Sequence, residues 1–150
     1  MIWTCKKFDE LTPRELYAIM QLRNEVFVVQ QNCVFQDADN KDQHCYHMMC
    51  MNNDKLVAYA RIVPHGIAYV ETSIGRVVTS PSARGTGIGN LLLSKTLDKV
   101  YSLYGNVPIK IGAQLYLKKF YESFAFEQTS DIYIEDDIQH IEMMLYHNAK

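Results

Sequence analysis

The chain of 150 residues contains 48% hydrophobic and 21% charged residues, which is the length and composition of one ordinary domain. Aromatic residues at 11% and a formal net charge of −2 exclude an intrinsically disordered chain. The balance of 15 basic to 17 acidic residues argues against a protein that binds nucleic acid mainly through its phosphates. No apolar run approaches the ~20 residues that span a bilayer, and the first ten residues lack a signal-peptide layout. We therefore expect one cytoplasmic domain over residues 1–150, with no nucleic acid and no membrane as partner.

The first half of the chain predicts one helix among four strands. Thr12 is a good N-cap, Pro13 suits the first helical position, and Glu15 completes a capping box, so a helix is expected over 13–28. Residues 36–42 form a polar loop. The predicted strands of this half span residues 3–8, 44–51, 55–63 and 71–80.

In the second half, the apolar residues take helical spacing from Ile88 until Gly105 and Asn106 stop the helix. The elements expected after it are a strand over 107–113, a helix over 115–124, and strands over 127–135 and 140–147. The resulting order is β-α-β-β-β-α-β-α-β-β. It combines hairpins with two βα units, which predicts an α/β fold with a mixed sheet and helices on both faces.

The segment with the clearest chemistry is a strand, a Gly-rich turn and the start of a helix. Gly85, Gly87 and Gly89 alternate in the turn, so backbone N–H groups can point inward without side-chain obstruction. The positive end of the helix dipole and the charge of Arg84 add to this. The turn therefore predicts a site for phosphate oxygens.

Two familiar phosphate-binding motifs do not match this turn. A Walker loop ends in Gly-Lys-Ser/Thr, but Asn90 follows Gly89. A dinucleotide fingerprint needs a wider spacing to its third glycine and an acidic residue after the next strand, where Gln114 stands instead. A nucleotide-dependent oxidoreductase is therefore disfavoured.

The cysteines and histidines do not predict a metal site. Cys5, Cys33, Cys45 and Cys50 include no Cys-x-x-Cys pair, and each is expected to be a buried structural thiol. If 44–51 is a strand, His44 and His47 point to opposite faces, and Cys50 lies ~20 Å from His44.

The sequence Arg84-Gly-Thr-Gly87-Ile-Gly89 resembles the pyrophosphate loop, Arg/Gln-x-x-Gly-x-Gly, of the GNAT acetyltransferases. The order of elements around it is also the GNAT order. Further segments are similar to the ElaA-like branch: residues 22–29 (LRNEVFVV), 31–33 (QNC), 36–37 (QD), Asp39, 56–61 (LVAYAR), 74–77 (IGRV) and 133–140 (YIEDDIQH). Three residues depart from the common pattern: Gln30 where Glu is common, Gln114 where Asn is common, and Ala125 in place of Gly.

The resemblance implies a single-domain GNAT fold. Its sheet would have about seven strands, be mostly antiparallel and flanked by helices, and split in a V between the strands at 71–80 and 107–113. The ligand would be acetyl-CoA as cosubstrate, with no metal. The residues implied to bind it are Val77, Val78, Thr79, Arg84, Gly85, Thr86, Gly87, Ile88, Gly89 and Gln114.

The resemblance also implies roles in acyl transfer. Tyr121 matches the tyrosine that serves as general acid, although an amphipathic core tyrosine is the alternative. Glu71 has the spacing of a base glutamate and equally fits a solvated strand end. His140 can face the acceptor cleft and bind substrate, or make a structural hydrogen bond. Residues 127–142 hold six acids and no Lys or Arg, which would attract a cationic amine if this hairpin borders the cleft, and otherwise form a solvated hairpin.

These expectations describe an acetyl-CoA-dependent N-acetyltransferase acting on a primary amine of a small molecule or peptide. The alternative from another class is an acyl-CoA-binding sensor or interaction module without turnover. In the sensor, Tyr121→Phe would change stability only. The resemblance also allows a homodimer through the exposed edge of the last strands.

Overall fold

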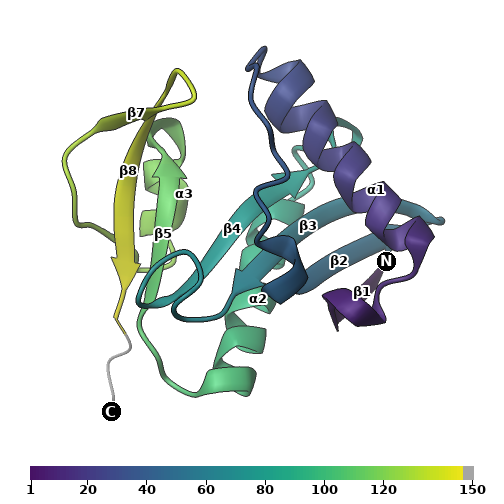
Figure 1. Ribbon diagram of the computed structural model, residues 1–150, viewed down its shortest axis with the longest axis horizontal. Helices are drawn as coiled ribbons and strands as arrows, with labels where there is room; N and C mark the ends of the chain where they lie inside the picture. Colours follow the sequence, from purple (N-terminus) through teal and green to yellow (C-terminus); the bar gives the residue numbers. More distant parts are fainter. Residues whose placement is uncertain (147–150) are drawn as a thin grey trace.

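The computed structural model describes residues 1–146 and contains one eight-stranded sheet (Figure 1). The strand order is β1-β2-β3-β4-β5-β8-β6, and β7 pairs with β8 beside β6. The strands are β1 (Ile2–Lys7), β2 (Tyr46–Asn52), β3 (Lys55–Val63), β4 (Thr72–Thr79), β5 (Ile109–Gln114), β6 (Glu127–Gln128), β7 (Tyr133–Glu135) and β8 (Ile138–Leu145). The α-helices are α1 (Pro13–Arg23), α2 (Ile88–Tyr104) and α3 (Lys118–Glu122).

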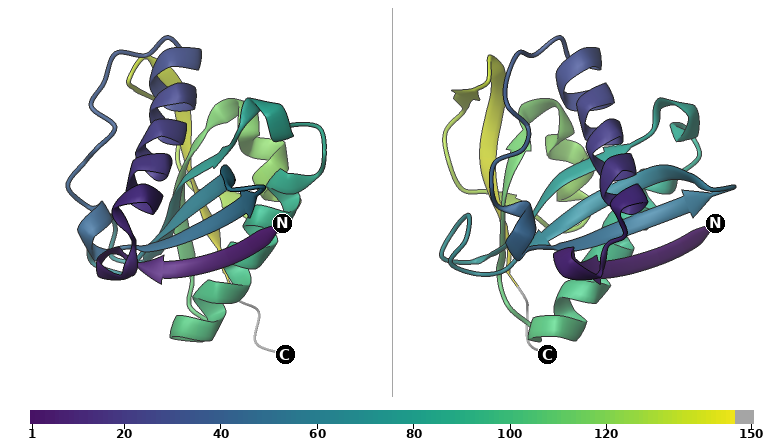
Figure 2. Two further views of the ribbon diagram at one scale, coloured as in Figure 1. Left: turned by 90° about the vertical axis from the view of Figure 1, so that its right-hand side faces the viewer. Right: turned by 45° about the vertical axis from the view of Figure 1, so that its right-hand side comes forward.

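Helices cover both faces of the sheet, with α1 and α2 on opposite sides (Figure 2, left). Ile19 and Leu22 of α1 pack on Met49 of β2, whereas Leu92 and Leu97 of α2 belong to the larger apolar cluster on the other face. Because both of its faces are covered, β3 is buried from its second residue onward.

The V-shaped split lies between β4 and β5, as expected. These two strands pair in parallel only at Thr72–Ile109 and Ser73–Lys110, and then separate. All other pairings in the described sheet are antiparallel. The sheet has eight strands rather than about seven because the strand predicted over 127–135 is two short strands, β6 and β7.

The first helix does not continue as an α-helix to residue 28. From Asn24 to Gln30 it widens into a π-helix, η2, with bonds such as that from the Gln31 N–H to the Val26 carbonyl. Apolar spacing does not distinguish this widening from an α-helix.

Three smaller differences concern element ends. The strand expected from residue 44 begins at Tyr46, because His44 lies in a 3₁₀ turn, η3 (Asp42–His44). The helix expected over 115–124 is a 3₁₀ turn, η5 (Leu115–Leu117), followed by α3. The last strand, expected over 140–147, ends at Leu145, and residue 147 lies outside the described residues.

Candidate active site

A cavity of about 530 Å³ lies where β4 and β5 have separated. The π-helix and the loop after it line one side, the start of α2 and the segment 116–121 another, and the β7–β8 hairpin a third. Among the residues predicted to bind the cofactor or substrate, or to catalyse, those that line the cavity are Val77, Val78, Thr79, Arg84, Gly89, Gln114, Tyr121 and His140.

The other predicted site residues lie outside the cavity lining. Gly85, Thr86, Gly87 and Ile88 form the turn and the first residue of α2 that lead to Gly89. Glu71 directly precedes β4, beside the Thr72–Ile109 pair where β4 and β5 are still joined. The structure therefore brings Tyr121 and His140 to one cavity but does not bring Glu71 there.

The Gly-rich turn has the backbone that a phosphate site requires. Gly85 and Gly87 have φ values of 78° and 81°, a left-handed conformation that costs other residues roughly 1–2 kcal/mol. Gly87 is the N-cap of α2, with no capping side chain and no acidic residue in the first turn. The first N–H groups of α2 therefore remain available to an anion.

Arg84 adds the positive charge at this end of the cavity. Its guanidinium donates a hydrogen bond of 2.7 Å to the side-chain oxygen of Gln30, the last residue of the π-helix. Gln30 is neutral, so this contact orients the guanidinium without neutralising it. The residues present therefore fit the phosphates of a coenzyme A thioester.

A bulge interrupts β4 next to the cavity. Tyr59 pairs with Val78 and Arg61 with Gly75, so Ala60 stands opposite both Arg76 and Val77. Arg76 has a φ of 50°, which is uncommon for a residue with a side chain. The bulge turns the backbone beside Val77 out of the regular ladder at the point where β4 lines the cavity.

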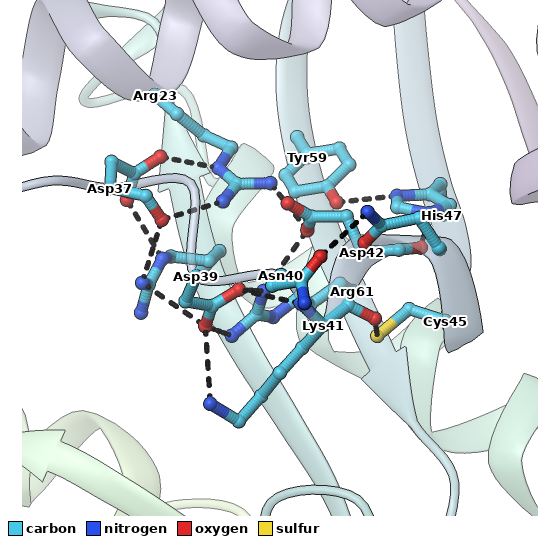
Figure 3. A network of polar contacts seen from close by, with 12 residues as sticks. Arg23, Asp37, Asp39, Asn40, Lys41, Asp42, Cys45, His47, Tyr59 and Arg61 are labelled. Atoms are coloured by element: carbon cyan, nitrogen blue, oxygen red, sulfur yellow. Dashed lines mark hydrogen bonds and ion pairs between the residues drawn. The ribbon is translucent and has the colours of Figure 1, made fainter.

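Six charged side chains form a largely buried network on the α1 face of the sheet (Figure 3). The members are Arg23, Arg61, Arg76, Asp37, Asp39 and Asp42. Its three arginines balance its three aspartates, and the more exposed Lys41 adds a positive charge 3.9 Å from Asp39 at the edge of the network. Hydrogen bonds from Arg61 hold the pKa of Asp39 well below its usual range.

The network ties the loop after the π-helix to the sheet. Arg23 is fully buried and reaches Asp37 and Asp42 at 2.7 Å each. Arg76 extends the network to the β4 bulge, with its Nε 2.8 Å from Oδ1 of Asp37. The loop over 31–42 and the bulge are therefore held in one arrangement. Arg61 and Arg76 thus act as ion-pair residues that join the sheet to this loop.

Tyr121 is only 6% exposed yet lines the cavity. Its ring makes edge contacts with Phe120 and Phe126, and burial raises the pKa of its phenol well above the usual range. The left-handed φ of 71° at Ala125 closes the turn after α3, where the N–H of Phe126 reaches the Tyr121 carbonyl. The phenol therefore stays protonated at neutral pH.

The opposite wall of the cavity is polar. Nδ1 of His140 lies 2.8 Å from the Ile138 carbonyl and its Nε2 lies 3.6 Å from Glu135. The ring of Tyr133 stacks on His140 with centroids 5.8 Å apart. Glu135 and Asp136 also line the cavity, and no lysine or arginine among the described residues forms an ion pair with either.

Sequence reasoning missed several residues of this wall. Tyr69, from the loop between β3 and β4, reaches Gly112 of β5, where an added Cβ would lie 2.9 Å from the Tyr69 hydroxyl and 3.2 Å from that of Tyr133. Gln31, which was not predicted as a site residue, exchanges amide hydrogen bonds of 3.0 and 3.3 Å with the predicted Gln114, and both line the cavity. These residues are distant in the sequence, and only the tertiary fold brings them together. Gly112 was the one sequence feature that could have indicated the contact, because a glycine within a strand often marks a close approach.

The sheet split at β4 and β5, the Gly-rich turn and the cavity between them define an acyltransferase of the GNAT fold. The model of the acetyltransferase (GNAT) domain family matches residues 11–147, and the chain belongs to this family, within its ElaA-like branch. It is 42% identical to protein ElaA of Escherichia coli strain K12 over 94% of each chain.

Solved structures agree with this assignment. The chain superposes on Escherichia coli ElaA with a TM-score of 0.90 at 41% identity, covering 95% of this chain and 97% of the other. An acyl-CoA N-acyltransferase from Pseudomonas aeruginosa gives 0.91 at 39% identity, with the same coverage of each chain. An aminoglycoside 6'-N-acetyltransferase complexed with coenzyme A shares the fold alone, with a TM-score of 0.72 at 17% identity over 100% of this chain and 99% of the other. Among the described residues, none of the helices could span a membrane.

Proposed function

We propose that this protein transfers the acetyl group of acetyl-CoA directly to a primary amine of a small molecule or peptide. The supporting observation is that a single cavity joins three parts: the start of α2 with Arg84, the phenol of Tyr121, and the polar wall that contains His140. Each part meets one requirement of the reaction, namely holding the anionic cosubstrate, protonating the leaving thiolate and receiving the amine.

The cofactor side would hold acetyl-CoA through the backbone and Arg84. The phosphates would meet the N–H groups from Gly85 to Gly89, and the pantetheine arm would pair with β4 over Val77–Thr79 like an added strand. Beyond Ser73, β5 no longer pairs with that edge of β4. Acetyl-CoA supplies a thioester, whose carbonyl would accept a hydrogen bond from the amide of Val77 or Val78 beside the bulge. Gln114 lines the cavity at the end of β5, where the strand faces this arm.

The charges at the two ends of the cavity favour a cationic acceptor. Arg84 gives the cofactor end an uncompensated positive charge, while Glu135 and Asp136 give the hairpin end negative charges. An anionic cosubstrate and a cationic amine would thus be attracted to opposite ends. His140 would contact the amine, and Tyr121 would give its proton to the departing sulfur.

The experiment that tests this function is calorimetric titration with acetyl-CoA and with NAD, followed by assays of CoA release with small amines and peptides. Gly87→Glu adds a carboxylate to the turn and should abolish acetyl-CoA binding. Gly87→Ala is the matched control, because it introduces the same left-handed strain without charge. It should retain more affinity than Gly87→Glu.

Three outcomes are possible. Acetyl-CoA binding with amine-dependent CoA release supports the transferase. Binding without release for any amine would indicate a sensor. Failure of the wild-type protein to bind acetyl-CoA would contradict the proposal.

A further inference from the structure

We propose that His140 is the general base that deprotonates the acceptor ammonium. This inference rests on the proposed function and adds a catalytic residue to it. His140 is the one histidine among the cavity-lining residues. It lies on β8, in the polar wall with Glu135 and Asp136 that we call the acceptor wall. It is remote in the chain from the Gly-rich turn over 84–89, which we call the cofactor turn. Glu71, the base that sequence spacing suggested, precedes the part of β4 where the cavity begins.

The tautomer of His140 is set by its backbone contact. A carbonyl oxygen only accepts hydrogen bonds, so the 2.8 Å contact with Ile138 requires Nδ1 to carry a hydrogen. In the neutral ring Nε2 then carries the lone pair. Nε2 lies 3.6 Å from Oε2 of Glu135, which also lines the cavity.

The surroundings of the ring support a transient positive charge. Glu135, from β7, lies 3.6 Å from Nε2 and would stabilise the imidazolium. Tyr133, also from β7, stacks on the ring of His140. On the other side of β8, the cross-strand partner of His140 is the neutral Gln114 of β5. Further along β8, the carboxylate of Glu142 is paired with Lys110 of β5 at 3.6 Å.

The other ionisable groups of the cavity are poorer bases. The Cys33 thiol donates to the Asp136 carbonyl, and burial raises its pKa. The side chain of Glu135 is 60% exposed, so its carboxylate is not held in place beside an acceptor as the His140 ring is. An imidazole is the side chain best suited to accept a proton near neutral pH.

The protons balance as follows. The acceptor R–NH₃⁺ gives its first proton to Nε2 of His140, which passes it to solvent. The free amine then forms the N–C bond to the acetyl carbon, and the C–S bond breaks. Tyr121 gives its phenolic proton to sulfur, and the second proton that leaves nitrogen restores the phenol. The products are the acetamide, the free thiol of CoA and one released proton.

The test compares two nucleophiles that differ in protonation. A primary alkylamine is cationic at pH 7 and needs a base, whereas an O-alkylhydroxylamine of the same chain length is neutral and does not. His140→Asn is the informative variant, because the Asn amide can keep the donor to Ile138 but cannot accept the proton. With the alkylamine, we expect kcat/KM to fall about 100-fold, a typical contribution of general-base catalysis. With the O-alkylhydroxylamine, we expect it to change little.

Equal losses on both nucleophiles would overturn the base assignment, because a merely structural role would lower both rates alike. His140→Ala with added imidazole provides a second measurement if the Asn variant folds poorly. Restored alkylamine turnover supports the proposal, and no restoration in a folded variant counts against it. If the wild-type protein turned over neither nucleophile nor any other amine, the proposed function itself would fail, and this inference with it.

Discussion

Arg76 and Asp37 are separated by 39 residues, yet Nε of Arg76 lies 2.8 Å from Oδ1 of Asp37. The same arginine adopts a φ of 50° at the bulge of β4. One side chain thus joins the loop that borders the acceptor wall to the strand that would hold the thioester. The ion pairs of Arg76 offset the cost of its left-handed backbone.

Substitution of Arg76 separates these two contributions to the free energy of unfolding. Arg76→Ala removes the ion pairs and keeps the backbone strain, whereas Arg76→Gly removes both. We expect a loss of about 2 kcal/mol for Arg76→Ala, at the low side for a broken buried pair because the side chain is 25% exposed. Arg76→Gly should be about 1 kcal/mol less destabilised. Urea unfolding measures both, and equal losses would show that the φ value carries no strain.

Tyr121→Phe tests the proton donor. We expect kcat to fall about 100-fold, because the thiolate would leave unprotonated. The Kd for acetyl-CoA and the unfolding free energy should change little, since the phenol forms no hydrogen bond within the described residues while its ring contacts remain. Tyr116→Phe is the matched control, because Tyr116 also lines the cavity but is 72% exposed. Unchanged kcat in the Tyr121 variant would contradict its role as the proton donor.

Gly112→Ala tests the acceptor wall. The new Cβ would lie 2.9 Å from the Tyr69 hydroxyl, so the tyrosine must move and the wall must change shape. We expect a higher KM for the amine and an unchanged Kd for acetyl-CoA. Gly89→Ala should raise the Kd for acetyl-CoA and leave the KM for the amine unchanged. Its Cβ would meet no protein atom within 4 Å, but Gly89 lines the cavity at the cofactor turn. The same change of amine KM in both variants would argue against separate subsites.

The buried His47 predicts how stability depends on pH. Its Nε2 donates to the Asp42 carbonyl and its Nδ1 accepts from the Tyr59 hydroxyl, so the folded ring is neutral. Burial lowers the pKa of His47 below its usual value of about 6.5. Below that pH the unfolded chain binds a proton that the folded chain does not, so the unfolding free energy should fall as pH decreases from 6.5 to 5.

Urea unfolding of the wild type and His47→Gln at several pH values between 5 and 7.5 checks this dependence. The variant should be less stable at pH 7.5 but show a shallower decline. Aspartates with lowered pKa values, such as Asp39, stabilise the fold above about pH 4 and lose this effect only at lower pH, so they do not contribute in this window. If the unfolding free energy of the variant fell with decreasing pH as steeply as that of the wild type, a group other than His47 would cause the pH dependence.

Local interactions explain what could be predicted from the sequence. Thr12 and Glu15 form the expected capping box, and Asn53 and Asp54 both take positive φ in the turn between β2 and β3. Gly105 ends α2 with a φ of 76°. Each depends on hydrogen bonds or steric limits within about four residues, which the residue types alone specify.

The same holds for the cofactor end of the candidate site. The turn over 84–89 and the start of α2 are continuous in the chain, so their motif and geometry could be recognised together. The resemblance to the GNAT family extended this from a local motif to the order of strands and the split of the sheet.

The sequence by itself thus determined most of the elements, the Gly-rich turn and the family. Only the tertiary structure decided the polar wall that contains His140 and what supports it. Tyr69 reaches Gly112 from a separate loop, and Arg23 and Arg76 meet Asp37 across the α1 face of the sheet. The π-helix was also decided by the tertiary structure, because the spacing of apolar residues does not distinguish a π-helix from an α-helix. Such contacts depend on how distant segments pack, and no pattern of neighbouring residues encodes the distance between them.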